Sequence, residues 1–333
     1  MRAKSRLAVV PACVAAGVLL SLFGCGLSKV DSREGTVKID GSSTVMPISA
    51  RVSEAYQEVA PDVQVPVGEA GTGSGMQKFI AGEIDICDAS RPIKPQEIEE
   101  LSEKGVEFIE LPIALDGLAI VVNKDNRWAT SITTSELRRI WAPDSQIHAW
   151  NEVRPEWPAK PLNLQGPGTN HGTYEYFADA IVKDKSKTTR QDYAQNQEYN
   201  TLVQGVSQDQ NALGYVGYAY YEENLDNLKL LAVDSGHGPV LPSPATIQDG
   251  SYEPLSRPLF IYVSKASLAR PEVKAFVQYY LDHASHLVGD AKYIPLPEET
   301  YALVQKRFKN MVSGSVFSDA PTSAKIDDLL STK

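Results

Sequence analysis

The sequence predicts an α/β fold in which two lobes enclose a cleft, and three observations support it. Short apolar strands alternate with amphipathic helices, which is typical of a largely parallel sheet with helices on its faces. Turns rich in glycine and hydroxyl residues join a strand to a helix three times, at residues 40–47, 68–75 and 166–173. Two long apolar stretches, residues 112–124 and 252–265, each indicate a strand that passes between the lobes.

The two crossing stretches set the expected domain boundaries. Because the chain leaves the first lobe and later returns to it, we expect lobe 1 to combine residues 37–114 with 257–333, and lobe 2 to comprise residues 115–256. At 333 residues the chain is long enough for two domains of ordinary size. Two helices, expected within residues 271–287 and 297–313, would cover the sheet of lobe 1.

Each of the three turns places backbone N–H groups and hydroxyls at the start of a helix. The first turn runs from Asp40 to Pro47, with the proline at an early helical position. The first N–H groups of a helix lack intrahelical partners and the helix dipole favours negative charge there, so such an end can bind an anion. One turn alone is more typical of an ordinary helix cap. Two such turns in lobe 1 and one in lobe 2 predict a ligand clamped in the cleft.

The charge of the chain argues against one class of partner. The formal net charge is −10, and this figure includes three positive charges in an N-terminal segment that the mature protein is expected to lose. A nucleic-acid-binding protein needs a basic face, so we expect no nucleic-acid partner. A small anion stays compatible with this charge, because local N–H groups and dipoles can bind an anion without net positive charge.

The N-terminus has the pattern of a secretory signal. Arg2, Lys4 and Arg6 precede an apolar stretch, and residues 1–24 together predict a signal peptide. The segment Leu22-Phe23-Gly24-Cys25 resembles the bacterial lipobox, in which the cysteine is lipidated, although Phe23 departs from the small or β-branched residue usual there. Residues 25–36 would then be a lipid-anchored tether. An uncleaved membrane anchor is the alternative, and it leaves the same domain outside the membrane.

Cysteine and histidine residues indicate neither a disulfide nor a metal site. Cys13 and Cys25 belong to the N-terminal segment, so Cys87 alone remains in the folded part, where its apolar strand predicts a small buried hydrophobe. His283 and His286 are expected to be exposed rather than metal ligands. We therefore expect no cofactor and no metal.

Two further segments carry expectations of their own. Trp141, Trp150 and Trp157 lie close together in the sequence among prolines, and they predict a surface loop packed by aromatic side chains. An aromatic platform that binds a sugar is the alternative. Residues 314–333 are mostly polar, and we expect them to be loosely ordered.

Five motifs make the chain similar to the PstS-type phosphate-binding proteins, the receptors of phosphate ABC transporters. The motifs span nearly the whole mature chain in the order of the family, and together they are specific, although each glycine-rich turn alone is a weak signal. The resemblance implies a type II periplasmic-binding-protein fold, with two α/β lobes joined by crossing strands that close over one phosphate. The motifs are DGSSTVMPIS (40–49), GTGSGMQKFIAGEIDICDASRPI (71–93), IALDGLAIVVNK (113–124), GPGTNHGTYEYF (166–177) and NALGYVGYAYYEEN (211–224).

The resemblance also implies which residues bind phosphate. Ligands in the family come from both glycine-rich turns of the first lobe, from the end of its third strand and from the turn of the second lobe. Carried onto this sequence, they are Ser43, Thr44, the N–H of Val45, Thr72, Ser74, Ser90, Arg91, Asn170, Gly172 and Thr173.

This chain departs from the family pattern at several of these positions. Many relatives have serine where His171 stands, and His171 would either donate to phosphate or point outward and contribute only its N–H. Pro167 and Ser90 occupy places where some relatives have an arginine and an aspartate. Arg91 would then supply the positive charge. Asp88 would accept the phosphate proton and so reject sulfate, unless strand alternation turns it away.

The resemblance implies a receptor that captures inorganic phosphate and delivers it to the permease subunits of an ABC transporter. We expect a monomer outside the cytoplasm, held to a membrane by the lipid on Cys25, and no enzymatic activity. The alternatives are a receptor for sulfate or molybdate, a phosphate sensor and a phosphatase. A phosphatase would need an activated nucleophile or a metal site, and the sequence indicates neither.

Overall fold

The computed structural model describes residues 34–169, 171–184, 188–196, 198–320 and 325–331. The expected signal peptide, Cys25 and Asn170 therefore lie outside the described residues. We keep the names lobe 1 and lobe 2 for the residue ranges defined above. Lobe 1 begins with β1 (Gly35–Thr36), β2 (Ile39–Gly41), α1 (Met46–Val59), β3 (Val63–Gln64), α2 (Thr72–Ile80), β4 (Ile86–Ala89) and α3 (Pro95–Glu103), and β5 (Phe108–Asn123) follows.

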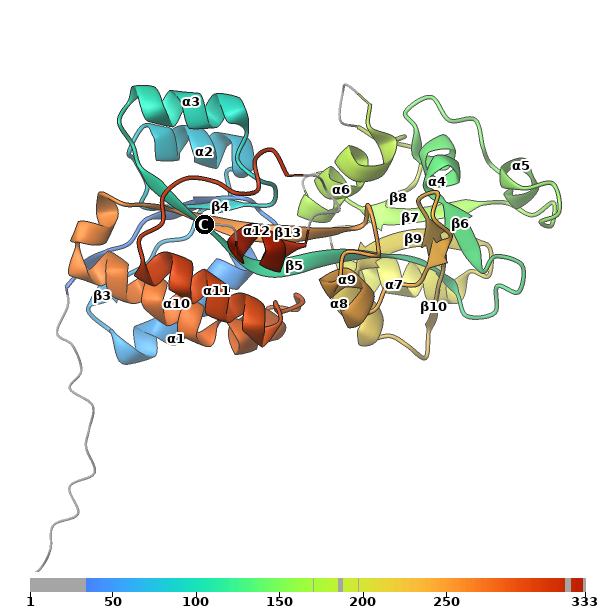
Figure 1. Ribbon diagram of the computed structural model, residues 1–333. Helices are drawn as coiled ribbons and strands as arrows, with labels where there is room; N and C mark the ends of the chain where they lie inside the picture. The colour runs from blue at the N-terminus through green and yellow to red at the C-terminus, as the bar shows by residue number, and fades with distance from the viewer. Residues whose placement is uncertain (1–33, 170, 185–187, 197, 321–324, 332–333) are drawn as a thin grey trace, which may run out of the picture. The chain divides into compact units, whose positions relative to one another are not determined.

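In the sequence, the elements of lobe 2 follow β5 and precede the strand that returns to lobe 1. Figure 1 shows them from green to orange. Its strands are β6 (Ser131–Thr133), β7 (Asn163–Pro167), β8 (Ala194–Asn196), β9 (Ala212–Gly217), β10 (Leu228–Leu230), β11 (Ala232–Asp234) and β12 (Pro239–Val240). Its helices are α4 (Thr134–Trp141), α5 (Trp150–Val153), α6 (Gly172–Phe177) with the π-helix η1 (Ala178–Val182), α7 (Tyr199–Gln208), α8 (Tyr218–Glu222) and α9 (Pro244–Gln248).

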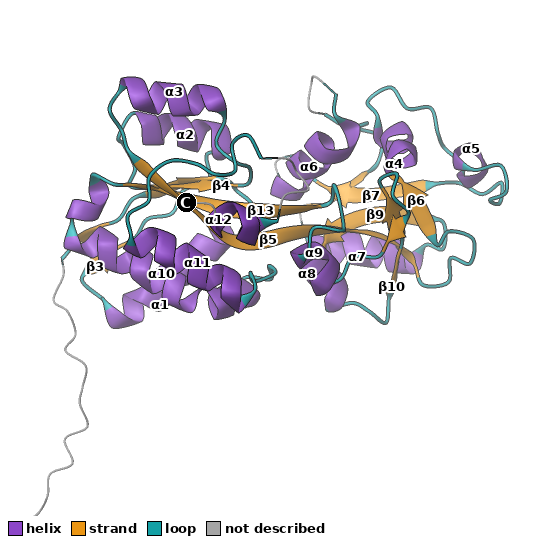
Figure 2. Cartoon of the chain, in the orientation of Figure 1, coloured by secondary structure: helices purple, strands orange, loops and turns teal. Residues whose placement is uncertain are grey.

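The chain then returns to lobe 1 through one strand and ends in helices. These elements are β13 (Ser256–Ser264), the 3₁₀ helix η2 (Ser267–Ala269), α10 (Pro271–Asp290), α11 (Glu298–Lys309) and α12 (Ile326–Ser331). Helix α10 packs against both α1 and α11, while α2 packs against α3. Figure 2 shows these two groups of helices on opposite sides of the strands. The expectation that the late helices cover the lobe 1 sheet is confirmed.

One eight-stranded sheet runs through both lobes, in the order β2-β4-β13-β5-β9-β7-β8, with β10 also paired to β5. The 16-residue strand β5 is buried along its whole length and pairs with β13 in lobe 1 and with β9 in lobe 2. The expectation of a largely parallel sheet is wrong. Both β13 and β5 run antiparallel to their neighbours. They are antiparallel to each other because the two crossing strands pass between the lobes in opposite directions.

Ser315 to Phe317, at the start of the C-terminal segment, are anchored, in contrast to the expectation of loose order. The carboxylate of Glu110, fully buried in β5, accepts hydrogen bonds from the Ser315 hydroxyl (2.7 Å) and the Val316 N–H (2.8 Å). The Phe317 side chain is buried against Phe260. The polar sequence suggested loose order, but its polar groups serve as hydrogen-bond donors to Glu110. A buried carboxylate needs such donors.

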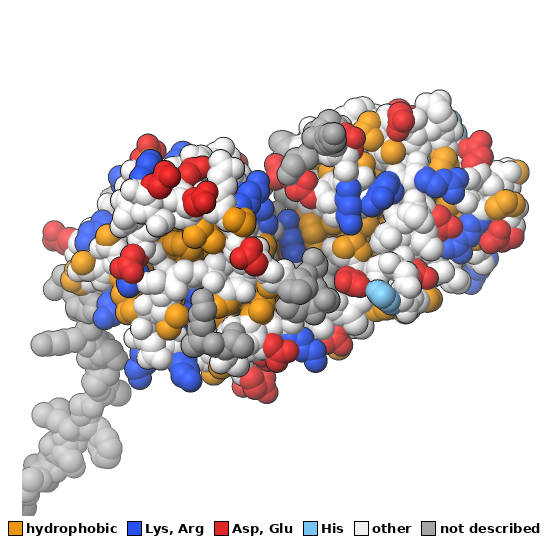
Figure 3. All heavy atoms as spheres, turned by 45° about the horizontal axis from the view of Figure 1, so that its top comes forward, with side chains coloured by type: hydrophobic (Ala, Val, Ile, Leu, Met, Phe, Trp, Pro, Cys, Tyr) orange, Lys and Arg blue, Asp and Glu red, His pale blue; other side chains and the backbone are white. Residues whose placement is uncertain are grey.

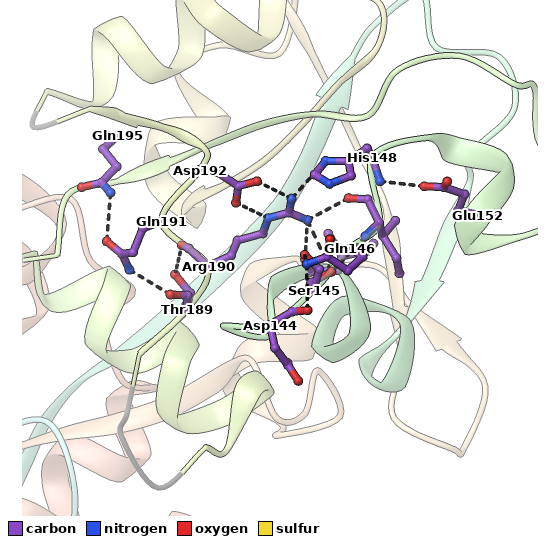
Figure 4. A network of polar contacts seen from close by, with 12 residues as sticks. Asp144, Ser145, Gln146, His148, Glu152, Thr189, Arg190, Gln191, Asp192 and Gln195 are labelled. Carbon is purple, nitrogen blue, oxygen red and sulfur yellow. Dashed lines mark hydrogen bonds and ion pairs between the residues drawn. The ribbon is translucent and has the colours of Figure 1, made fainter.

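The tryptophan-rich region is packed by aromatic side chains, as expected, but it is not the expected surface loop, because Trp141 and Trp150 lie in α4 and α5. The sugar-platform alternative fails because the rings are buried. Trp141, Trp150 and Trp157 are all buried. The buried Arg190 guanidinium fastens this region: it donates to the Ile140 carbonyl (3.1 Å) and binds Asp192 through two hydrogen bonds (Figure 4). The guanidinium holds the pKa of the Asp192 carboxyl at about 2.

The expectations for Cys87, His283 and His286 are confirmed. Cys87 is a buried free thiol, and His283 and His286 are exposed. Within the described ranges, no three His, Cys, Asp or Glu side chains are grouped so that they could hold a metal ion. In the same ranges, no helix combines the length and apolar character needed to cross a membrane.

Candidate functional site

The first turn is held in shape by its own serine and by a carboxylate beneath it. The Ser42 hydroxyl accepts the Thr44 N–H (3.2 Å), and the Ser42 carbonyl accepts the Val45 N–H (3.1 Å). Asp40 accepts hydrogen bonds from the N–H groups of Gly41 (2.8 Å) and Ala70 (2.9 Å), so it fastens the first turn to the second. The Val45 N–H, an expected ligand, is therefore occupied inside the turn. The Ser43 N–H has no hydrogen-bond partner among the described residues.

The lobe 2 turn opens helix α6 at Gly172. The His171 ring caps this helix, since its Nδ1 accepts the Thr173 N–H (3.3 Å) and lies 3.4 Å from the Tyr199 hydroxyl. Burial lowers the pKa of His171, which favours the neutral ring with its proton on Nε2. The Thr173 and Tyr199 hydroxyls are hydrogen-bonded to each other. Within the described part of the chain, the Gly172 N–H has no partner.

The two turns meet at what we call the interlobe junction, formed by Thr44, Asp116, Gly172 and Arg257. A Cβ atom added to Gly172 would lie 2.2 Å from the Thr44 hydroxyl oxygen, so only glycine allows this approach. The Arg257 guanidinium donates to the Thr44 hydroxyl (3.3 Å) and to Asp116 Oδ2 (3.2 and 3.3 Å). Arg257 and Asp116 face each other because they are register partners on the antiparallel strands β13 and β5.

Two cavities adjoin the junction, and Leu115 lines both. The first, of about 360 Å³, is lined by Ser43, Thr44 and Asp116 and by the lobe 2 turn from His171 to Thr173. The second, of about 380 Å³, contains Arg257 together with Ser90 and Arg91. Figure 3 shows one face of the molecule hollowed between the lobes, with Lys and Arg side chains at the hollow. The junction is thus a polar contact with open space beside it.

The remaining lobe 1 residues of the expected ligand set are divided between two environments. The Thr72 hydroxyl accepts the Ser90 N–H (3.2 Å) and lies 3.2 Å from the Ser90 hydroxyl, so these two residues form a pair. Ser74 is exposed and lines neither cavity. Ser43, Thr44, Gly172 and Thr173 thus line the first cavity together, whereas Ser90 lines the second cavity and Thr72 lines neither.

Arg91 does not supply the positive charge of the junction. Its guanidinium makes a bidentate pair with Glu97 (2.9 and 2.7 Å) and donates to the Pro92 carbonyl (3.0 Å). Glu97 also accepts the Lys94 N–H at the start of α3, and together these contacts hold the pKa of Glu97 below its ordinary value despite burial. The arginine therefore stabilises the entry to α3.

Asp88 is not part of the site, which corrects the expectation that it reads the phosphate proton. Its side chain is fully buried in lobe 1 and lines neither cavity. Oδ1 accepts a hydrogen bond from the Ser49 hydroxyl (2.9 Å), which in turn lies 3.2 Å from the Tyr280 hydroxyl, while Oδ2 has no partner in the described structure. Strand β4 is covered on both faces, and Asp88 points toward α1 and α10.

Burial of Asp88 predicts a pH-dependent stability. It raises the pKa of Asp88 from 3.8 to about 8, because the ionised form is desolvated. The neutral form favours the folded state, so this contribution is complete below pH 3.8 and is lost as the pH rises through about 8. Between these values the free energy of unfolding should fall by up to about 1.4 kcal/mol per pH unit. An Asp88→Asn variant should lack this slope.

Urea unfolding of the wild type and of Asp88→Asn at pH 5, 6, 7 and 8 measures the difference. An Asp62→Asn variant, altered at an exposed carboxylate, is the matched control and should follow the wild type. Parallel pH profiles for the wild type and Asp88→Asn would show that the carboxyl is ionised in the fold.

Arg257 and Asp116 are the residues of the junction that sequence reasoning missed. Each is a charged residue inside a long apolar strand, and that is the signal that could have found them. A charged side chain within a buried strand needs a partner, and opposite charges in two crossing strands are candidates for each other. Burial raises the pKa of Asp116, and the Arg257 guanidinium opposes this rise.

A family model and two relatives named in this paragraph are similar to most of the chain. Residues 28–283 match the model of the PBP superfamily domain. The chain is 42% identical over 319 residues to the protein SphX of Synechococcus elongatus, which covers 95% of this chain and 93% of SphX. It is 38% identical over 297 residues to the phosphate-binding protein PstS of Staphylococcus epidermidis, with 89% of each chain covered.

A solved structure is similar over most of the described fold. It is the crystal structure of "a possible phosphate binding protein" from Planctomyces limnophilus, with 45% sequence identity and a TM-score of 0.79. The match covers 84% of this chain and all of that one. By its sequence, its fold and these relatives, the chain belongs to the PstS-type phosphate-binding proteins of the PBP superfamily.

Proposed function

We propose that this protein captures inorganic phosphate at the interlobe junction and delivers it to the permease of an ABC transporter. The observation that carries the proposal is the meeting of anion-binding groups from both lobes at one point. The Thr44 hydroxyl and the Ser43 N–H come from lobe 1, the Gly172 N–H comes from lobe 2, and Arg257 lies on a crossing strand. The relative from Staphylococcus epidermidis is named a phosphate-binding protein, which supports this role.

The donors at the junction suit a desolvated anion. Phosphate stripped of water needs many donors, since burying an unpaired charge is very costly. The Ser43 and Gly172 N–H groups, the Thr44 hydroxyl and the Arg257 guanidinium supply them. Each charge-assisted hydrogen bond contributes roughly 1.5–3 kcal/mol. Arg257 thus takes the role that the sequence analysis gave to Arg91.

Asp116 takes the role that the sequence analysis gave to Asp88. It is 5% exposed and lines the first cavity beside Thr44 and Gly172. A carboxylate at this place accepts the proton of hydrogen phosphate, whereas sulfate has no proton to donate and would leave the buried acceptor unpaired. Arg257 favours the ionised form of Asp116 that this role requires. We therefore propose selection of phosphate over sulfate and molybdate through Asp116.

Calorimetric titration of the purified protein, stripped of bound anion, tests the function. We expect phosphate to bind with micromolar affinity or better, which corresponds to about −8 kcal/mol. Sulfate and molybdate should bind at least about a hundredfold more weakly. Equal binding of sulfate would refute the proton-reading role of Asp116, and failure of every oxyanion to bind would refute the phosphate receptor. Steady hydrolysis of a chromogenic phosphate ester would contradict our proposal that the protein is not an enzyme.

The N-terminal segment supports a proposal on location. We propose that the mature protein is a monomer outside the cytoplasm, held to the membrane by lipid on Cys25, because residues 1–25 have the order of a signal followed by a lipobox. The mass of the protein isolated from membranes shows where the mature chain begins and whether it carries acyl groups. A mature chain that begins elsewhere, or that carries no acyl groups, would refute the anchor.

A further inference from the structure

The first cavity extends well beyond the anion-binding groups of the junction. Four tyrosines line part of it: Tyr199, Tyr218, Tyr220 and Tyr293. Tyr199 and Tyr220 have their ring centroids 4.1 Å apart and belong to lobe 2, whereas Tyr293 comes from lobe 1 after helix α10. We call this part of the cavity the tyrosine chamber.

The size of the cavity exceeds the need of inorganic phosphate. Its volume of about 360 Å³ lies in the range of roughly 300–1,000 Å³ that pockets for small organic molecules occupy. An ion of five heavy atoms held against Thr44 and Gly172 would leave most of this space beside the aromatic rings. The junction end is a built polar site, because Thr44, Asp116 and Thr173 are each more than nine-tenths buried.

The charges around the chamber favour a cation. Three carboxylates line the cavity: the exposed Glu69 and Glu198, and the buried Asp116. Lys292 also lies on the wall, but its ammonium is paired with Glu223 across the lobes. Tyrosine rings attract a cation placed over their faces, and carboxylates nearby add to this attraction.

We propose that the tyrosine chamber receives a small, positively charged organic group attached to the phosphate, so that the protein also binds cationic phosphate monoesters. The anionic head occupies the interlobe junction, and the cationic group lies among the rings of Tyr218, Tyr220 and Tyr293. This inference rests on the proposed phosphate site and extends its ligand class.

Competition titrations with phosphocholine as the probe test the proposal. Phosphate is measured first, then phosphocholine, methyl phosphate and free choline. We expect phosphocholine to bind about fivefold or more tightly than methyl phosphate, because only its substituent carries a charge for the rings. Free choline should not compete. Phosphocholine that binds no better than methyl phosphate would overturn the proposal. Absence of phosphate binding itself would instead refute the phosphate site.

Two variants separate the chamber from the junction. Tyr220→Ala and Tyr293→Ala each remove one ring and leave the junction residues in place. Each should weaken phosphocholine by about fivefold and leave phosphate within about twofold. Tyr279→Ala on the half-buried outer part of α10, which lines neither cavity, is the matched control and should change neither ligand. Equal losses for both ligands in the chamber variants would mean that the rings only support the fold, and would overturn the proposal.

Discussion

An Arg257→Ala variant is expected to lose phosphate affinity by at least about a hundredfold, or about 3 kcal/mol. Arg257 is the arginine that contacts Thr44 and Asp116 at the junction. Its removal deletes the charge-assisted donors to the anion and leaves Asp116 buried beside that anion without its counter-charge. The phosphate affinity of an Arg257→Lys variant should lie between those of the wild type and Arg257→Ala. Lysine keeps the charge but lacks the planar guanidinium that reaches both partners.

Titration calorimetry measures the affinities, and thermal unfolding monitors the fold of each variant. Arg51→Ala is the matched control, since Arg51 pairs with Asp290 on the surface of lobe 1 and should have no effect on binding. A double variant, Arg257→Ala with Asp116→Ala, removes the unpaired carboxylate and restores folding if Arg257→Ala alone is unstable. Phosphate affinity within about threefold of the wild type in a folded Arg257→Ala variant would remove this arginine from the site.

A Gly172→Ala variant is expected to bind phosphate about 10- to 100-fold more weakly without losing stability. The new methyl group would lie 2.2 Å from the Thr44 hydroxyl and 3.0 Å from the Thr44 backbone nitrogen, so the lobes could not approach as they do here. Forcing an extra carbon into such a contact costs about 1–3 kcal/mol. The residue is the first of helix α6, where alanine is a better helix former than glycine.

The combination of weaker binding and an unchanged or raised melting temperature is the signature of a change confined to the lobe contact. Gly289→Ala in α10 is the control, because a Cβ there meets no atom within 4 Å and binding should be unaffected. A Gly172→Ala variant that binds like the wild type would show that Thr44 and Gly172 do not approach each other in the ligand-bound protein.

Much of the site could be predicted because its elements are local. The turn at Ser43 and the turn at Gly172 each combine a strand, hydroxyl or glycine residues and a helix start within a few residues. The structure places both at the junction. The lobe-crossing role of residues 112–124 was equally visible, because a long apolar run has room for one strand in each lobe.

The parts that sequence reasoning missed depend on orientation and register. Asp88 and Arg91 stand near the right place in the chain, but the sequence does not say which face of β4 looks into the cleft or that Glu97 captures the arginine. The pairing of Arg257 with Asp116 exists only because β13 aligns antiparallel with β5 at that register. Two residues so far apart in the chain give no local pattern.

The place of β13 in the sheet also bears on the order in which the protein can be assembled. This strand lies between β4 and β5, although both emerge from the ribosome long before it. Until β13 arrives, the lobe 1 half of β5 and the inner edge of β4 have exposed backbone groups and no neighbour. Lobe 2, which is one uninterrupted segment, can complete its pairing of β5 with β9 earlier. A newly made chain would therefore hold an unpaired sheet edge until synthesis reaches β13, so a late segment of the chain completes the lobe that begins it.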